Sequence, residues 1–120
     1  MRFVNEIEGL LHRLGIGVRY VGFRYMAVCI DLAAVEPDRL LNVSKRLYPE
    51  VARRCGLDDP MQIERNLRTV IRTCWDYGNR PLLSLLAGYN VIEKPSCVEF
   101  IDILSSYIRR NRLSEEGPAS

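Results

Sequence analysis

Residues 62 to 79 read QIERNLRTVIRTCWDYGN and have the residue spacing of a long amphipathic α-helix. Apolar side chains recur three and four positions apart, so at 100° per residue they share one face of the helix. These apolar positions are Ile63, Leu67, Val70, Ile71 and Cys74. The opposite face carries Arg65, Thr69, Arg72 and Asp76 with Gln62 beside them, and Glu64 and Arg68 flank the apolar stripe. Gly78 and Asn79 indicate the helix end, and we expect one face to pack on a core while the other stays accessible.

The residues in front of this helix predict a helix-turn-helix at about residues 49–77. PEVARRC at 49–55 has the pattern of a short helix, and GLDDP at 56–60 has the composition of a tight connection. Ala52 is small, which suits a position where two helices cross closely, and Gly56 can adopt the positive φ that a sharp turn needs. Asp59 before Pro60 is a favourable start for the second helix, with Asp59 as the capping residue.

The rest of the chain is also predicted to be helical, without a convincing strand. The expected helices are 3–14, 21–35, 37–48 with a restart at Pro49, 60–77, 81–87 and 97–110, and residues 16–20 form a linker. Ser96 is the expected cap of the last helix, whose predicted apolar face is Val98, Ile101, Leu104 and Ile108. The fold class is therefore all-α, a compact bundle of about six helices. Residues 1–112 form one domain in this prediction, and residues 113–120 a disordered tail.

Length and composition agree with one soluble domain in the cytoplasm. The chain has 120 residues, of which 48% are hydrophobic, and this suffices for a single core. No stretch approaches the ~20 continuous apolar residues of a membrane span. Glu6 and Glu8 interrupt the apolar N-terminal segment, which is unlike a secretory signal. The four cysteines are Cys29, Cys55, Cys74 and Cys97, too far apart in sequence for a CxxC motif, so we expect reduced, mostly buried thiols.

Nothing in the sequence predicts an enzyme, a metal site or a cofactor. His12 is the only histidine, and a single helical histidine is more often a surface residue than a catalytic base. GIGVRYVG lacks the spacing and the final lysine of a phosphate-binding loop. The acidic pair Asp58-Asp59 is explained by the start of a helix, where negative charge is favourable.

The cationic residues are unusual in kind, because nearly all of them are arginine. Net charge is only +2, yet Lys45 and Lys94 are the only lysines among 17 cations. Arginine can hold a phosphate or a guanine through two hydrogen bonds. A coding bias in a GC-rich genome explains the same composition equally well.

Two interpretations of the polar helix face stay open from the residues alone. Arginine-rich faces are usually only solvated, and Glu64–Arg68 is an i,i+4 pair that would stabilise an isolated helix by ~0.3 kcal/mol. Alternatively, the face enters a DNA major groove, where arginine binds guanine and glutamate accepts from cytosine. Arg53 and Arg54 in the preceding helix could then hold phosphates. This second interpretation requires Arg65 and Arg68 to project outward without obstruction.

Several blocks in fixed order resemble a known family. LYPEVARR at 47–54, IERNLRTVIRTCW at 63–75, GN at 78–79 and LLAGY at 85–89 are the strongest matches, and IGV at 16–18 and GFRYM at 22–26 also match. From about Leu11 to Arg110 the chain resembles the C-terminal DNA-binding domain of the stage-zero sporulation response regulator. The resemblance implies an all-α fold that places the second helix of a helix-turn-helix in the major groove of double-stranded DNA.

The resemblance also implies site residues. Glu64, Arg65 and Arg68 retain the family positions that read bases. Two positions depart from the family pattern: Gln62 replaces a basic residue and Thr69 replaces a histidine, and both can still form hydrogen bonds. The expected auxiliary contacts to the DNA backbone are Gln62, Thr69, Arg53, Arg54 and Arg72.

The resemblance leaves alternatives for regulation and partners. The family's regulator carries a phosphorylated receiver domain before this domain, and only Met1 precedes Arg2 here. The chain is therefore expected to be either a stand-alone regulator without a receiver or an excised domain. Tandem sites and a homodimer would strengthen DNA binding. The alternative function is a protein-interaction module that docks on a full-length regulator or on RNA polymerase, for which Leu82, Leu83, Leu85 and Leu86 offer an apolar surface.

Overall fold

The fold is organised around one helix that is buried on nearly all sides. In the computed structural model, which describes residues 2–116 and their side chains as far as Arg112, this helix is α2 (Val21–Val35). Eleven of its 15 residues are buried, as expected for a helix that is apolar all round. It packs against α1 (Val4–Arg13), α4 (Tyr48–Cys55), α5 (Met61–Tyr77) and α7 (Cys97–Glu116). The described part of the chain contains helices and no strand, which confirms the all-α prediction.

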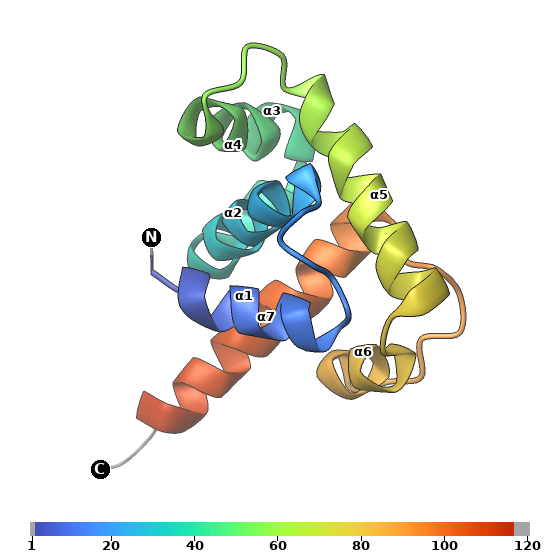
Figure 1. Cartoon of the computed structure of the whole chain (residues 1–120). Helices are drawn as coiled ribbons and strands as arrows, with labels where there is room; N and C mark the ends of the chain where they lie inside the picture. The colour runs from blue at the N-terminus through green and yellow to red at the C-terminus, as the bar shows by residue number, and fades with distance from the viewer. Residues whose placement is uncertain (1, 117–120) are drawn as a thin grey trace.

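The other helices surround α2 in chain order. After α2 come a 3₁₀ helix, η1 (Pro37–Leu41), and a short helix, α3 (Val43–Arg46), both beside α4 at one end of the molecule (Figure 1). Helix α5 then runs along one side of the molecule to α6 (Arg80–Ala87). Helix α7 passes behind α1 in the view of Figure 1 and also packs against α2. Within residues 2–116 no helix is both long and apolar enough to span a membrane.

The prediction of one continuous helix over residues 37–48 is wrong, because Asn42 divides it. Asn42 has an extended backbone (φ −156°, ψ 82°), and its side-chain oxygen accepts a hydrogen bond from Lys45 N at 3.3 Å. Asparagine competes with helical hydrogen bonds in this way and favours helix starts over helix interiors. The segment therefore forms η1 and α3, and the chain direction changes before α4.

Two glycines allow close approach of α5 to its neighbours. A Cβ atom on Gly22 of α2 would lie 2.4 Å from the backbone oxygen of Asn66 in α5. At the C-terminal end of α5, a Cβ on Gly15 would lie 2.9 Å from Gly78 Cα, and Gly15 has a positive φ of 94°. Asn79 N donates a hydrogen bond to Leu14 O at 3.1 Å in the same place. Helix α5 is thus held within its first half and at its C-terminal end by close backbone contacts that side chains would block.

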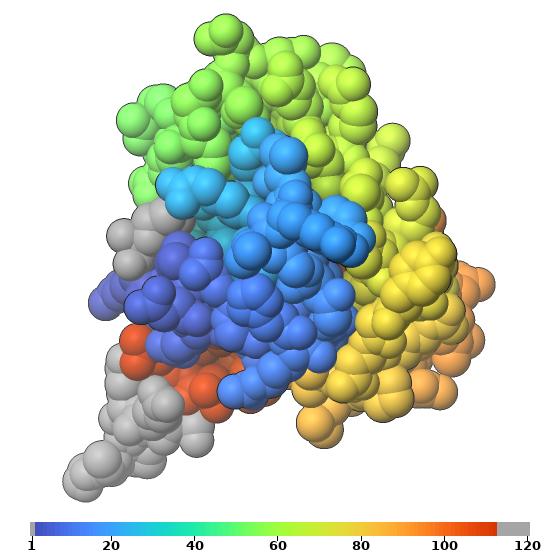
Figure 2. All heavy atoms as spheres, viewed as in Figure 1, coloured from blue at the N-terminus to red at the C-terminus, as the bar shows by residue number. Residues whose placement is uncertain are grey.

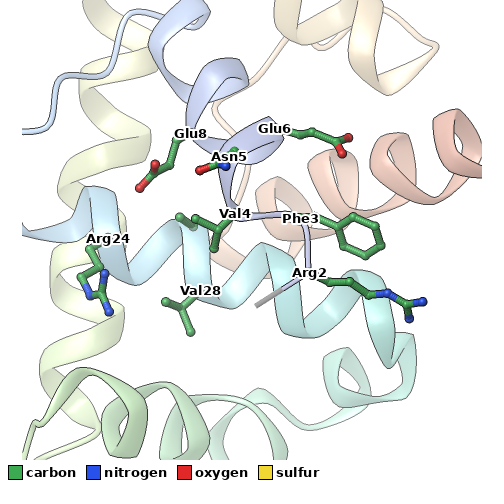
Figure 3. Close-up of a pocket in the computed structure, with 9 residues that line it drawn as sticks. Arg2, Phe3, Val4, Asn5, Glu6, Glu8, Arg24 and Val28 are labelled. Atoms are coloured by element: carbon green, nitrogen blue, oxygen red, sulfur yellow. The ribbon is translucent and has the colours of Figure 1, made fainter.

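The start of the chain is tied to the middle of α2. Phe3 N donates a 2.6 Å hydrogen bond to a carboxylate oxygen of Asp31, which is buried. A cavity of about 310 Å³ lies beside this anchor, and Figure 3 shows Val4 over α2 with Arg24 on the opposite side from Phe3. Acidic and basic side chains both line the cavity. The hydrogen bond from Phe3, directly before α1, to Asp31 helps to hold α1 against α2.

Helix α7 begins as predicted but buries a different set of residues. Glu99 N donates to the Ser96 hydroxyl at 3.1 Å and Ser96 N donates to the Glu99 carboxylate at 2.8 Å, a reciprocal capping box. Val98 is exposed, so its predicted place on the apolar face is wrong. Fully buried Phe100 fills that face together with Ile101. The helix continues to Glu116, four residues into the predicted tail, and residues 117–120 lie outside the described residues.

Arginine side chains cap the C-terminal ends of four helices. The bonds to carbonyl oxygens are Arg109 to Ala33 in α2 (3.1 Å), Arg39 to Arg46 in α3 (2.6 Å), Arg80 to Trp75 in α5 (2.6 Å) and Arg110 to Leu86 in α6 (2.9 Å). The last carbonyls of a helix have no partner within the helix, and a cation near them is favourable. Part of the arginine content is therefore explained by the fold itself.

Candidate nucleic-acid interface

Helices α4 and α5 pack against each other and are joined by residues 56–60. Gly56 ends α4 in the left-handed conformation (φ 72°, ψ 32°), and Leu57 N donates to Ala52 O at 2.8 Å. Ala52 is buried, as expected where the helices approach. The Asp59 carboxylate accepts a hydrogen bond from Met61 N at 2.9 Å, so Asp59 assists the start of α5 although Pro60 directly precedes the helix.

The apolar face of α5 lies in the core, as predicted. Its five predicted core residues are all buried: Ile63, Leu67, Val70, Ile71 and Cys74. Trp75 packs partly against the core, and the Arg80 guanidinium lies 4.1 Å from its ring centroid. This burial fixes the rotation of α5 about its axis, so its polar face points out of the domain.

Both predicted base-reading arginines project outward. Arg65 is exposed, and the Arg68 side chain is 72% exposed. Arg68 Nη2 lies 3.3 Å from a Glu64 carboxylate oxygen in an exposed i,i+4 pair. Such a pair contributes little stability in water, so its members can exchange it for contacts to a ligand. Among the residues that the structure describes, none forms an ion pair with Arg65. The first half of α5 and α4 together form one end of the molecule in the space-filling view (Figure 2).

The predicted auxiliary residues of α5 differ in how accessible they are. Arg72 is exposed, whereas Gln62 and Thr69 are half-buried. The Thr69 hydroxyl lies 3.5 Å from Arg65 O and turns back toward the helix backbone. Of these three side chains, that of Arg72 is therefore the most accessible from solvent.

The two arginines of α4 share one acceptor that sequence reasoning missed. Arg53 Nε and Arg54 Nε donate to the Glu50 carboxylate at 3.1 Å and 2.7 Å. Hydrogen bonds from Arg53 and then Arg54 lower the pKa of Glu50 to about 2. Glu50 precedes them by three and four residues, a spacing that brings side chains together on a helix and could have predicted the contact.

A match to the family described as "Sporulation initiation factor Spo0A C terminal" covers residues 7–108. The chain belongs to the Spo0A C-terminal family. The chain is thus a DNA-binding domain of the sporulation transcription factor type, and it binds double-stranded DNA. This is a regulatory family and not an enzyme family.

Most thiols of this Spo0A C-terminal domain are buried. Cys29, Cys74 and Cys97 are buried and Cys55 is half-buried, which confirms the predicted burial. Burial raises the pKa of Cys74 to about 11 and that of Cys29 well above its usual value. No cluster of His, Cys, Asp or Glu side chains within the described part of the chain could hold a metal ion.

Proposed function

We propose that this domain recognises a specific DNA sequence by placing the N-terminal half of α5 in the major groove. In this proposal α4 and α5 form a helix-turn-helix, and bound DNA couples the domain to transcription in the cytoplasm. The observation that carries the proposal is the exposure of Arg65 and Arg68 on a helix whose opposite face is buried. Side chains in this arrangement can reach base edges while the domain stays folded.

The residue roles follow from the chemistry of the groove. Arg65 and Arg68 each present a planar guanidinium that can bind O6 and N7 of a guanine together, contributing ~1–3 kcal/mol of discrimination per base. Glu64 accepts from a cytosine amino group or orients Arg68 through their 3.3 Å contact. Gln62, Thr69 and Arg72 make backbone or water-mediated contacts, and Arg53 and Arg54 hold phosphates of the same duplex.

Affinity is expected to be modest for a single domain. The net charge is only +2, and phosphate contacts supply much of the affinity of DNA-binding proteins. Two domains on tandem sites, as a homodimer, would compensate.

The test combines binding-site selection with one variant. The wild-type domain selects sequences from a random duplex pool, and the returned operator is compared with a scrambled duplex in titrations at equal salt. Arg65→Ala should lower the preference for the operator by roughly 5–150-fold, the factor that corresponds to ~1–3 kcal/mol. Helix content by circular dichroism should be unchanged, because Arg65 is exposed. An unchanged operator preference in this variant would overturn the assignment.

A second candidate function rests on the exposed apolar side chains around α6. Leu85 is 75% exposed and Tyr77 and Tyr89 are also exposed, whereas Leu83 and Leu86 are buried. Such a surface fits a protein partner, with RNA polymerase or a full-length regulator as the candidates. If the domain shows no salt-dependent binding to any duplex in the pool, this function is favoured over DNA recognition.

A further inference from the structure

A cleft of about 440 Å³ lies beside α5 where the chain leads into α7. Its charged lining residues come from two separate parts of the sequence: Glu64, Arg68 and Arg72 from α5, and Lys94 and Glu99 from the start of α7 and the segment before it. The segment between α6 and α7 turns back toward α5 (Figure 1). Lys94 of this segment therefore lines the same cleft as Arg68 and Arg72 of α5. No local sequence pattern predicts this neighbourhood.

The acidic groups of the cleft are already engaged. Glu64 pairs with Arg68, and the Glu99 carboxylate accepts the Ser96 backbone N–H, which lowers the pKa of Glu99. Arg72 and Lys94 are exposed, and within the described residues neither forms an ion pair. The cleft therefore presents two exposed cations that could bind an anion, next to the helix proposed to enter the groove.

The backbone directly after Lys94 is held in place by its neighbours. Pro95 directly after it is buried, and Ser96 is locked to Glu99 by the two hydrogen bonds of the capping box. The capping box also occupies the N–H group of Glu99 in the first turn of α7. Attraction of an anion to this cleft therefore depends on the side chains of Lys94 and Arg72, and not on the helix terminus.

We propose that Lys94 and Arg72 hold a backbone phosphate of the DNA strand that borders the major groove beside α7. This inference rests on the proposed function, because it presumes that α5 occupies the groove. A helix with its side chains is about 10–12 Å across, close to the ~12 Å width of the major groove, so groups at its edges lie near the sugar-phosphate backbones. The contact is separate from that of Arg53 and Arg54, which belong to α4. Lys94 is thus a positioning residue that fixes α5 in the groove and reads no sequence.

The test measures the salt dependence of binding for Lys94→Ala. Each phosphate neutralised by a cation contributes about 0.9 to the slope of log Kobs against log salt concentration. We expect Lys94→Ala to reduce that slope by about 1 and to weaken binding to operator and scrambled duplex by the same factor. Lys94→Arg should restore the slope, since the charge is retained.

The matched control removes one positive charge at the end of α1, beside the C-terminal half of α7. Arg13 is exposed and lines a cavity with Tyr107 and Asn111, far along α7 from Lys94. Arg13→Ala should bind both duplexes with nearly the wild-type slope, so a general loss of charge is distinguished from loss of a contact.

The outcomes separate this inference from the proposed function. If Arg65→Ala loses operator preference while Lys94→Ala keeps the wild-type affinity and slope, the phosphate contact is refuted and DNA recognition by α5 stands. If Lys94→Ala weakens operator binding alone, Lys94 reads a base, and the positioning role is refuted. If the wild-type domain shows no salt-dependent duplex binding, both proposals fail.

Discussion

Replacing Gly22 by alanine should destabilise the domain, although alanine is the better helix former. The new Cβ would lie 2.4 Å from Asn66 O and 2.7 Å from a methyl group of Val70, both in α5. The first distance is about 1 Å short of ordinary van der Waals contact, and the obstructing atom belongs to backbone that cannot rotate away. Helix α5 must therefore shift relative to α2.

The expected magnitude follows from two opposing effects. Overpacking at a tight contact costs about 1–3 kcal/mol. The gain in helix propensity is at most about 1 kcal/mol and is smaller here, because Gly22 is the second residue of α2. A net loss of about 1–2 kcal/mol should lower the melting temperature by roughly 4–8 °C for a domain of this size.

The assay is urea unfolding followed by circular dichroism, with Gly9→Ala as the matched control. Gly9 lies in the middle of α1, and a Cβ there has nothing within 4 Å, so this variant should be stabilised by about 0.5–1 kcal/mol. The two Gly→Ala changes thus have opposite expected signs. If Gly22→Ala proves as stable as Gly9→Ala, the backbone contact between α2 and α5 is refuted.

Three further predictions concern charge, capping and thiol reactivity. The folded-state pKa of Glu50 is lowered from 4.5 to about 2, so its stabilising contribution is complete above pH 4.5 and is lost as the pH falls toward 2. Unfolding measured across this range should show a smaller acid destabilisation for Glu50→Gln than for the wild type, and identical pH profiles would contradict the pairing. Ser96→Ala should reduce the free energy of unfolding by about 1 kcal/mol, with Ser96→Thr recovering most of it, because the hydroxyl caps α7. A disulfide reagent should modify Cys55 first in the native protein and the three buried thiols only on unfolding; rapid reaction of a second thiol would argue against their burial.

Periodicity and capping residues predicted the elements whose signals are local. The predicted helix at 21–35 matches α2, and the Ser96 cap and the five core positions of α5 are confirmed. These succeeded because spacing of apolar residues and helix-start chemistry act within a few positions of the chain. The division at Asn42 also has a local cause, because the asparagine side chain favours a new helix start even where the apolar spacing continues.

The parts that escaped prediction depend on neighbours distant in sequence. A glycine is needed at position 22 only because the backbone of Asn66, in another helix, lies against it. Lys94 borders α5 only because the chain turns back after α6. A single sequence shows which faces are apolar but not which two backbones meet, so such contacts come only from the three-dimensional arrangement.

The arginines that cap helix ends restrict which substitutions the fold tolerates at their positions. An arginine at an exposed position such as Arg13 could change to lysine with little effect on the fold. Arg109 and Arg110 are constrained differently, because their planar guanidinium groups bridge from α7 to the carbonyl oxygens of Ala33 and Leu86. Relatives from genomes of low GC content should therefore lose arginine unevenly, keeping it where it joins two helices and replacing it where it meets only water.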